Sequence, residues 1–301
     1  MQTNSSRYVG RFAPSPSGPL HLGSMLTAVA SYLEAKSNRG LWHLRIDDLD
    51  PPRIVTGSCQ QILNTLEKYH LAWDGDVVYQ SQRNSGYQDY LQHCIDQNLT
   101  YPCNCPRHKI MAVGGIYPGT CLTHPPSQND SPCAIRIKTP DNAIKFEDDC
   151  QGMIEQHIPT EVGDFIIKRK DGLFAYHLAC VVDDHLQGIT HIVRGRDLLD
   201  STPRQIYLQQ ILNFSTPSYC HLPIVVNQEG FKLSKQAQAT NIDLLPTNET
   251  LSFILSALGL TPPQSVQDSV PLMLQWGIDH WSSHELTDKL TITESSLQHY
   301  V

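Results

Sequence analysis

Short apolar segments alternate with amphipathic helical patterns along the first third of the chain, and this alternation limits the possible folds more than any other feature. Residues 7–13 and 41–46 are typical of strands, and the second is apolar enough to be buried. Between them, apolar residues recur at helical spacing after Ser24, a capping residue, to an end near 38–40. Further helical patterns surround Ile62 and Leu91. Strands that alternate with helices predict an α/β fold whose parallel sheet is covered by helices on both faces.

The second half of the chain continues with similar elements. Strands are expected at 134–138, 190–194 and 222–226, and a hairpin is expected from 165–168 and 173–176 around a Lys-Asp-Gly turn. Thr202 and Pro203 supply a cap and a first-turn proline for another helix. The final part of the chain is expected to be mostly helical.

Composition and charge exclude several classes of protein. Of the 301 residues, 40% are hydrophobic and only 17% are charged, which argues against disorder and against a coiled coil. No membrane span or signal peptide is recognisable, so we expect a cytoplasmic protein without a membrane partner. Nine cysteines, an odd number, predict thiols that are reduced, buried or metal-bound. The net charge of −8 excludes a general polyanion binder but leaves room for a local basic surface.

A loop rich in proline and glycine, Pro14–Pro19, precedes His21 and Gly23 at the expected start of a helix. Backbone N–H groups and the helix dipole at such a position favour an anionic phosphate, and His21 would add a donor. An alternative is a tight turn in which the histidine only caps the helix. Late in the chain, Lys232 and Lys235 flank Ser234, and these groups suit charge that develops on a phosphate; the alternative is a solvated surface.

Residues 101–133 form a stretch rich in Cys, Gly, Pro and His without periodicity, which indicates a small inserted module. Cys103, Cys105 and Cys121 offer three thiolates that suit one structural, tetrahedral Zn²⁺. Simple ligand chemistry favours Cys133 or His108 as the fourth ligand. Four other cysteines, Cys59, Cys94, Cys180 and Cys220, stand in apolar contexts and are expected in the core.

Two segments, PSPSGPLHLGS and KLSKQ, together resemble the HIGH-type and KMSKS-type signatures of the class I glutamyl-tRNA synthetases. Residues 45–53 resemble the acidic segment that follows the second strand in that family. The resemblance implies a Rossmann-like catalytic domain with an inserted zinc-binding subdomain. The short length and the Gly114–Tyr117 and Asp183–His185 clusters resemble the truncated branch of the family that glutamylates queuosine in tRNA(Asp).

The resemblance also implies an order of parts along the chain. They are a first half of the catalytic domain at 1–100, a zinc-binding insert at 101–133, the remainder of the insert and the return at 134–190, a second catalytic half with the KLSK loop at 191–240, and a small helical appendage at 241–301 in place of an anticodon-binding domain.

Site residues follow from the resemblance by position. Arg11 and Arg194 match arginines that grip the carboxylates of glutamate, Asp47 matches the group that meets its ammonium, and Ser15 and Tyr176 add hydrogen bonds. The implied glutamate site also includes Phe12, Ala13 and Pro14. The implied ATP site consists of His21, Gly23, Ser24, Lys232, Ser234 and Lys235, of which His21 and Lys235 are expected to act in catalysis.

The chain departs from the family pattern at two site positions, and the resemblance also bears on the identity of the fourth zinc ligand. Ser24 replaces the second histidine of the HIGH signature, and Asp47 stands where glutamate is usual. Ser24 lacks the imidazole donor of that histidine, and the side chain of Asp47 is shorter than that of glutamate and reaches less far into the implied amine pocket. The resemblance points to Tyr117 as the fourth zinc ligand.

The function implied is activation of glutamate by ATP and Mg²⁺ without tRNA, then transfer to queuosine at the wobble position of tRNA(Asp). The partners implied are glutamate, ATP and the anticodon stem-loop, and the protein is expected to be a monomer. Two alternatives are a short synthetase that charges the tRNA 3′ end and a non-catalytic RNA-binding relative. Basic residues at 168–170 and 194–196 predict salt-sensitive RNA binding despite the net charge of −8.

Overall fold

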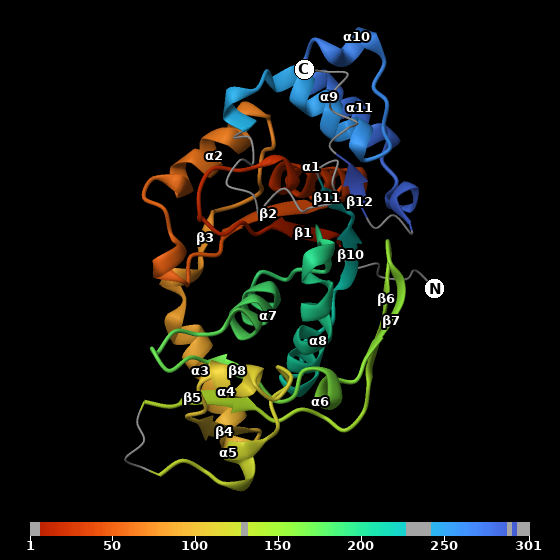
Figure 1. Cartoon of the computed structure of the whole chain (residues 1–301). Helices are drawn as coiled ribbons and strands as arrows, with labels where there is room; N and C mark the ends of the chain where they lie inside the picture. The colour runs from red at the N-terminus through yellow and green to blue at the C-terminus, as the bar shows by residue number, and fades with distance from the viewer. Residues whose placement is uncertain (1–6, 128–131, 227–241, 288–290, 294–301) are drawn as a thin grey trace.

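A central sheet of parallel strands organises the computed structural model, which describes residues 7–127, 132–226, 242–287 and 291–293 (Figure 1). Strand β1 (Val9–Phe12) pairs with β2 (Leu41–Ile46), and β2 pairs with β3 (Val78–Tyr79). Strand β9 (His191–Gly195) pairs with β10 (Ser218–Leu222), which also meets β6 (Ile144–Asp148). The N–H of Thr190 donates to the Val9 carbonyl at 2.9 Å and joins the two sets of strands. The predicted parallel sheet is confirmed.

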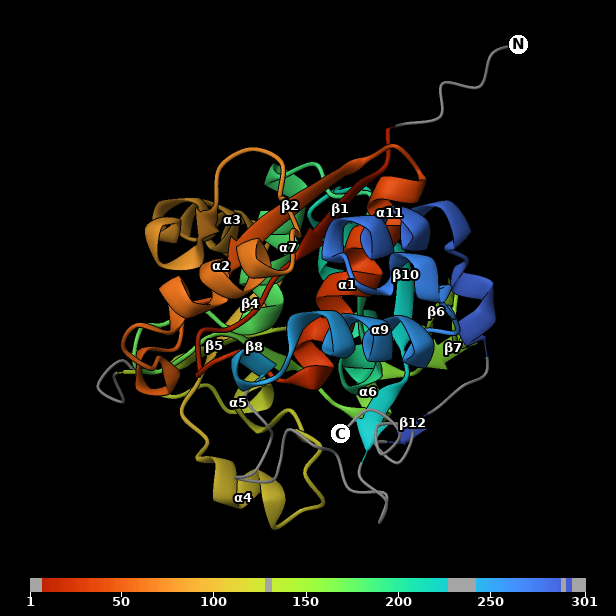
Figure 2. The same cartoon turned by 90° about the horizontal axis from the view of Figure 1, so that it is seen from above.

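Helices cover both faces of this sheet, as the alternation of buried residues along β9 and β10 shows. Val193 and Cys220 belong to one core cluster, whereas Ile192 and Tyr219 belong to the other. The first cluster contains residues of α1 (Leu22–Ser37) and α2 (Ser58–Lys68). The second contains residues of α3 (Asn84–Asp96), α7 (Tyr176–Leu186) and α8 (Thr202–Ile211). Figure 2 shows these helices around the sheet from above.

The predicted insert folds around a small antiparallel sheet of β4 (Thr100–Cys103), β5 (Ala134–Ile137) and β8 (Phe165–Lys168). Between β4 and β5 lie α4 (Arg107–Met111) and α5 (Thr120–Thr123), and these helices are too short to bury a core. A separate cluster of Tyr101, Cys103, Tyr117 and Cys121 forms there instead. A hairpin of β6 with β7 (Gly152–Gln156) and the short α6 (Ile158–Glu161) follow.

The last described residues form helices that pack on α1. They are α9 (Thr247–Ala257), α10 (Gln264–Gln267) and α11 (Val270–His280), and the prediction of mostly helical structure is confirmed for them. Helices α9 and α11 pack on α1, and Phe253 and Met273 share the core cluster of Leu33, so this packing continues the hydrophobic core on that face of the sheet. Strand β12 (Thr291–Thr293) pairs in parallel with β11 (Ile224–Val226). Short 3-10 turns occupy Pro51–Arg53, Gln80–Gln82, Arg196–Ser201, Ile242–Leu244 and Ser283–Leu286.

Three local predictions were wrong. His21, not Ser24, is the N-cap of α1, and its Nδ1 accepts the Ser24 N–H at 3.3 Å. The expected hairpin is reduced to a single bridge between Lys168 and Phe174, because Tyr176 already begins α7. The strand expected at 222–226 is split at Pro223, which has no N–H for a ladder.

Cys150 and Cys220 form a disulfide, which corrects the expectation of reduced thiols at these two positions, whereas Cys220 lies in the core as expected. Their Cα atoms lie 5.3 Å apart although 70 residues separate them in sequence. The pairing of β10 with β6 produces this proximity, which no local pattern reveals. Cys94 and Cys180 are buried as expected, and Cys59 is half-buried. Among the described residues, no helix has the length and apolar character required to cross a bilayer.

Candidate active site

A cavity of about 320 Å³ lies where β1 and β9 end and α1 begins. The carboxyl ends of neighbouring parallel strands are the usual ligand position of open α/β sheets. Every predicted glutamate-site residue, and every predicted ATP-site residue within the described chain, lines it: Arg11, Phe12, Ala13, Pro14, Ser15, His21, Gly23, Ser24, Asp47, Tyr176 and Arg194. Lys232, Ser234 and Lys235 lie outside the described residues.

Arg194 is held at the end of β9 with only 3% of its surface exposed. Its Nε donates to His221 Nε2 at 3.0 Å and its Nη2 to Thr202 Oγ1 at 2.7 Å. Its Nη1 lies 3.5 Å from Tyr176 Oη, and its guanidinium lies over the Tyr219 ring. A buried cation with these partners is oriented in advance for an anion in the cavity.

Arg11 and Asp47 belong to one buried ionic network. Asp184 Oδ1 accepts from Arg11 Nε at 3.1 Å and from Arg45 Nη1 at 2.7 Å. Arg45 Nε donates to Asp47 Oδ1 at 2.8 Å. Burial raises the pKa of Asp184, but Arg11 and Arg45 outweigh it and hold that pKa well below its usual range. Arg11 and Arg45 thus share the carboxylate of Asp184, and Arg45 is also paired with Asp47.

The electrostatic state of Asp47 differs from that of Asp184. Burial raises the pKa of Asp47 to about 6, although Arg45 acts in the opposite direction. The carboxylate form therefore predominates at neutral pH. An ammonium group in the cavity would find an acceptor charge at Asp47.

The start of α1 combines the two interpretations of His21. The ring caps the helix through Ser24 N–H, and its Nε2 lies 3.0 Å from Ser24 Oγ, while His21 and Gly23 also line the cavity. Helix α1 has 16 residues, and its N-terminus lies at this cavity. The N–H groups of its first turn and the positive end of its dipole are therefore available to an anion in the cavity. Capping and anion binding are compatible here.

The contacts of some buried polar residues around the site were not predicted from the sequence. Asp183 accepts from Arg83 Nε at 2.5 Å, Tyr87 Oη at 2.7 Å and Gln80 Nε2 at 2.8 Å. Two adjacent aspartates within an otherwise apolar helix were the signal for such a network. His221, to which no role was assigned, is wholly buried against Asp148 and Arg194. A lone histidine in an apolar strand carries no local signal of this kind.

The predicted zinc ligands lie together in the insert. The sulfur atoms of Cys103, Cys105 and Cys121 all lie within 4.8 Å of one another. Tyr117 Oη lies 3.5 Å from Cys103 Sγ and 4.0 Å from Cys105 Sγ. Among the described residues this group includes neither His108 nor Cys133, so the geometry favours Tyr117 as the fourth ligand. Three thiolate donors at these separations fit a tetrahedral metal.

Of the basic residues at 168–170 and 194–196, Arg194 is buried in the cavity. Arg169 pairs with Asp50 at 3.0 Å and Asp171 at 2.6 Å. Lys168 and Lys170 donate to Gln88 and to the Asn104 carbonyl, which are neutral partners and cancel no charge. Because Lys170 is exposed, the local basic surface at 168–170 stays a prediction.

Comparison with known proteins agrees with this geometry. The family model for the catalytic domain of class I tRNA synthetases (E and Q) matches residues 8–260. A glutamate tRNA ligase structure from Elizabethkingia meningosepticum, in complex with its amino acid, superimposes with a TM-score of 0.81 at 24% identity. The superposition covers 98% of this chain and 69% of the ligase chain, and this similarity shows that the two proteins share a fold.

Relatives of higher sequence identity show to which branch of the class I tRNA synthetases the chain belongs. A glutamyl-Q tRNA(Asp) synthetase from Pseudomonas aeruginosa is 46% identical over 294 residues, which cover 97% of this chain and 100% of the relative. One from Ectopseudomonas mendocina is 44% identical over 297 residues, which cover 98% and 100%. The chain therefore belongs to the glutamyl-Q tRNA(Asp) synthetase family, within the class I tRNA synthetases.

Proposed function

We propose that this protein activates glutamate with ATP, without tRNA, and transfers the glutamyl group to queuosine at the wobble position of tRNA(Asp). The observation that carries this proposal is the cavity in which Arg11, Asp47, Arg194 and His21 meet at the N-terminus of α1. Relatives with the corresponding name extend over nearly the whole chain. In this pocket the guanidinium groups of Arg11 and Arg194 complement the two carboxylates of glutamate, and the carboxylate of Asp47 complements its ammonium.

The proposed reaction has two steps. The α-carboxylate of glutamate attacks the α-phosphorus of ATP in line, pyrophosphate leaves, and glutamyl adenylate forms. A hydroxyl of queuosine then attacks the acyl carbon and AMP leaves. Positioning and charge stabilisation supply most of the rate of such a displacement.

Each group in the cavity has a proposed task. Arg11 and Arg194 bind carboxylate, Asp47 binds the ammonium, and Ser15 and Tyr176 supply hydrogen bonds. His21 and the first turn of α1 contact phosphate, while Gly23 and Ser24 line the nucleotide subsite. Lys232, Ser234 and Lys235, in the segment outside the described residues, are proposed to meet the triphosphate with its Mg²⁺, with Lys235 stabilising the developing charge.

The acceptor and the organisation of the chain are also part of the proposal. We propose a monomer that binds the anticodon stem-loop of tRNA(Asp) and uses the order of parts predicted from the sequence, from the catalytic halves at 1–100 and 191–240 to the helical segment at 241–301.

The function is tested by the position of the label after reaction with ATP, Mg²⁺, radiolabelled glutamate and total tRNA. After nuclease digestion, we expect label on an anticodon nucleoside, and none with tRNA from cells without queuosine. Label on the terminal adenosine would identify a short synthetase instead. Neither label nor glutamate-dependent ATP–pyrophosphate exchange would leave a non-catalytic RNA-binding protein.

The raised pKa of Asp47 predicts a pH dependence of glutamate binding. Below a pH of about 6 Asp47 becomes protonated and loses the charge that meets the ammonium of glutamate. We expect KM for glutamate to rise about tenfold per pH unit below that point, because only the carboxylate form binds. The KM for ATP, measured in the same exchange assay, serves as the internal control. A glutamate KM that stays constant between pH 5 and about 7.5 would contradict the role of Asp47.

We also propose that Cys103, Cys105, Cys121 and Tyr117 hold one Zn²⁺, which stabilises the insert. Arg136 Nε lies 3.2 Å from Cys103 Sγ and its guanidinium stacks 3.6 Å from the Tyr117 ring centroid, so a cation already faces the thiolate side of the cluster. The small apolar cluster of this insert is otherwise insufficient to fix its fold.

Metal content tests the zinc proposal. The purified protein is expected to contain one zinc, and Cys121→Ser is expected to lose it and to unfold at a lower temperature. Cys59→Ser, at a half-buried cysteine of α2, should keep the metal. Tyr117→Phe should weaken zinc retention whereas His108→Ala should not; the opposite pattern would assign the fourth ligand to His108.

A further inference from the structure

His221, in β10, is wholly buried between an acid and a cation. Its Nδ1 lies 2.5 Å from Asp148 Oδ2, and its Nε2 lies 3.0 Å from Arg194 Nε. A guanidinium can only donate, so Nε2 must be the acceptor and Nδ1 must carry the proton. The ring is thus a neutral Nδ1–H tautomer. Through its two nitrogen atoms it links Asp148 to Arg194 and so fixes the position of Arg194 relative to Asp148.

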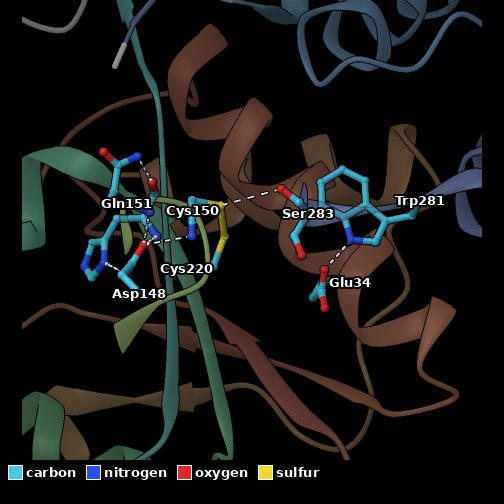
Figure 3. Close-up of a disulfide and its surroundings, with 8 residues drawn as sticks. Glu34, Asp148, Cys150, Gln151, Cys220, Trp281 and Ser283 are labelled. Carbon is cyan, nitrogen blue, oxygen red and sulfur yellow. Dashed lines mark hydrogen bonds and ion pairs between the residues drawn. A yellow bond between two sulfur atoms is a disulfide. The ribbon is translucent and has the colours of Figure 1, made fainter. Parts of the chain in front are cut away.

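Asp148 is itself fixed by the backbone. Its Oδ1 accepts the N–H groups of Cys150 at 3.1 Å, Gln151 at 2.9 Å and His221 at 3.1 Å. The disulfide of Cys150 with Cys220 links the residue two after Asp148 to the residue before His221. Figure 3 shows Asp148 and Gln151 beside this disulfide. Because both partners are tied to the same strand pair, their relative position has little freedom.

Thr202 completes the cluster at the start of α8. Its Oγ1 accepts from Arg194 Nη2 at 2.7 Å and lies 3.0 Å from His221 Nε2. Two edges of the Arg194 guanidinium are therefore bound before any ligand arrives. Burial, the largest influence, lowers the pKa of His221; Arg194 acts in the same direction and Asp148 opposes it, in keeping with a neutral ring.

We infer that the Asp148–His221 pair is a positioning unit that holds Arg194 in the orientation required by a carboxylate of the amino acid substrate. This inference rests on the proposed function, because it assigns the anion at Arg194 to glutamate. Neither Asp148 nor His221 lines the cavity, so they act through Arg194 and not on the reacting atoms.

Two substitutions of His221 distinguish a role in positioning Arg194 from a role in packing alone. In His221→Asn the amide nitrogen takes the place of Nδ1 and still donates to Asp148, but Arg194 Nε loses its acceptor, while Thr202 still accepts from Nη2. In His221→Gln the carbonyl oxygen reaches the place of Nε2 and accepts from Arg194, while the bond to Asp148 is lost. A purely structural histidine would tolerate or reject both changes alike.

We expect His221→Asn to raise KM for glutamate about ten- to hundredfold in ATP–pyrophosphate exchange, because Arg194 loses a charged hydrogen bond. The KM for ATP should change about threefold at most, and the glutamate KM of His221→Gln, which keeps the acceptor for Arg194 but loses Asp148, should lie between those of the wild type and His221→Asn. His191→Asn, at a half-buried histidine stacked on Tyr8, is the matched control and should resemble the wild type. A wild-type glutamate KM in His221→Asn, or equal losses in both His221 variants, would overturn the inference.

A spectroscopic measurement tests the inference without activity and without a variant that must fold. Long-range ¹H–¹⁵N correlation spectra of the histidine rings should show His221 as a neutral Nδ1–H tautomer. A ring protonated at Nε2 near neutral pH would overturn the inference even if the enzyme is active. A wild-type protein without glutamate-dependent exchange would instead contradict the proposed function, while the tautomer would still be measured.

Discussion

Arg194→Lys is expected to reduce kcat/KM for glutamate by about 100- to 1000-fold. Lysine cannot replace the Nε bond to His221 and the Nη2 bond to Thr202 while also offering a fork to the substrate carboxylate. Hydrogen bonds to charged groups contribute about 1.5–3 kcal/mol each, and each 1.4 kcal/mol corresponds to about tenfold. The loss should appear mainly in KM for glutamate, since the proposed phosphate contacts are made by other residues of the cavity.

ATP–pyrophosphate exchange at varied glutamate concentration measures this effect. Arg39→Lys provides the matched control, because Arg39 is an exposed residue in the turn after α1. It should leave both Michaelis constants unchanged. If Arg194→Lys stayed within about tenfold of the wild type, Arg194 would not be the main carboxylate anchor.

Asp184→Asn is expected to destabilise the protein by about 3–5 kcal/mol, since it leaves two buried guanidinium groups without their shared carboxylate. Arg11 and Arg45 are 4% and 0% exposed, so water cannot replace Asp184. The same change should weaken glutamate activation, because Arg11 loses its partner at 3.1 Å. Urea unfolding at neutral pH measures the stability difference.

The control for this prediction is Asp171→Asn. Asp171 pairs with Arg169 on the surface, where the side chains are 48% and 42% exposed, and such pairs contribute less than about 1 kcal/mol. Equal losses of stability in the two variants would contradict the importance of the buried network.

The pH dependence of stability gives a second test of Asp184. Because Arg11 and Arg45 hold its pKa in the folded protein below the unfolded value of about 3.9, the carboxylate stabilises the fold at higher pH. This contribution is complete above the unfolded pKa and is lost as pH falls further toward the folded pKa. The wild type should therefore lose stability steeply below a pH of about 4, and Asp184→Asn should show a flatter profile.

The amino-acid sequence by itself determined the α/β class, and the family resemblance of its motifs pointed to eleven of the residues that line the cavity. Their proximity has a physical reason: Arg11, Asp47 and Arg194 lie at or next to the carboxyl ends of strands, and the carboxyl ends of parallel strands meet at one edge of the sheet. The three cysteines of the insert could also be predicted as a cluster from the sequence, because they lie close together in the chain and thiolates are preferred ligands of zinc.

Only the tertiary structure decided which buried groups hold the site in place. The links of His221 to Asp148 and of Cys220 to Cys150 depend on the pairing of β10 with β6, across about 70 residues of sequence. The charge balance of Asp184 with Arg11 and Arg45 depends on α7 lying against the strand ends, with up to 173 residues between partners. Local patterns reflect preferences within a turn or a strand, whereas burial, tautomer and pKa depend on neighbours that only the folded chain supplies.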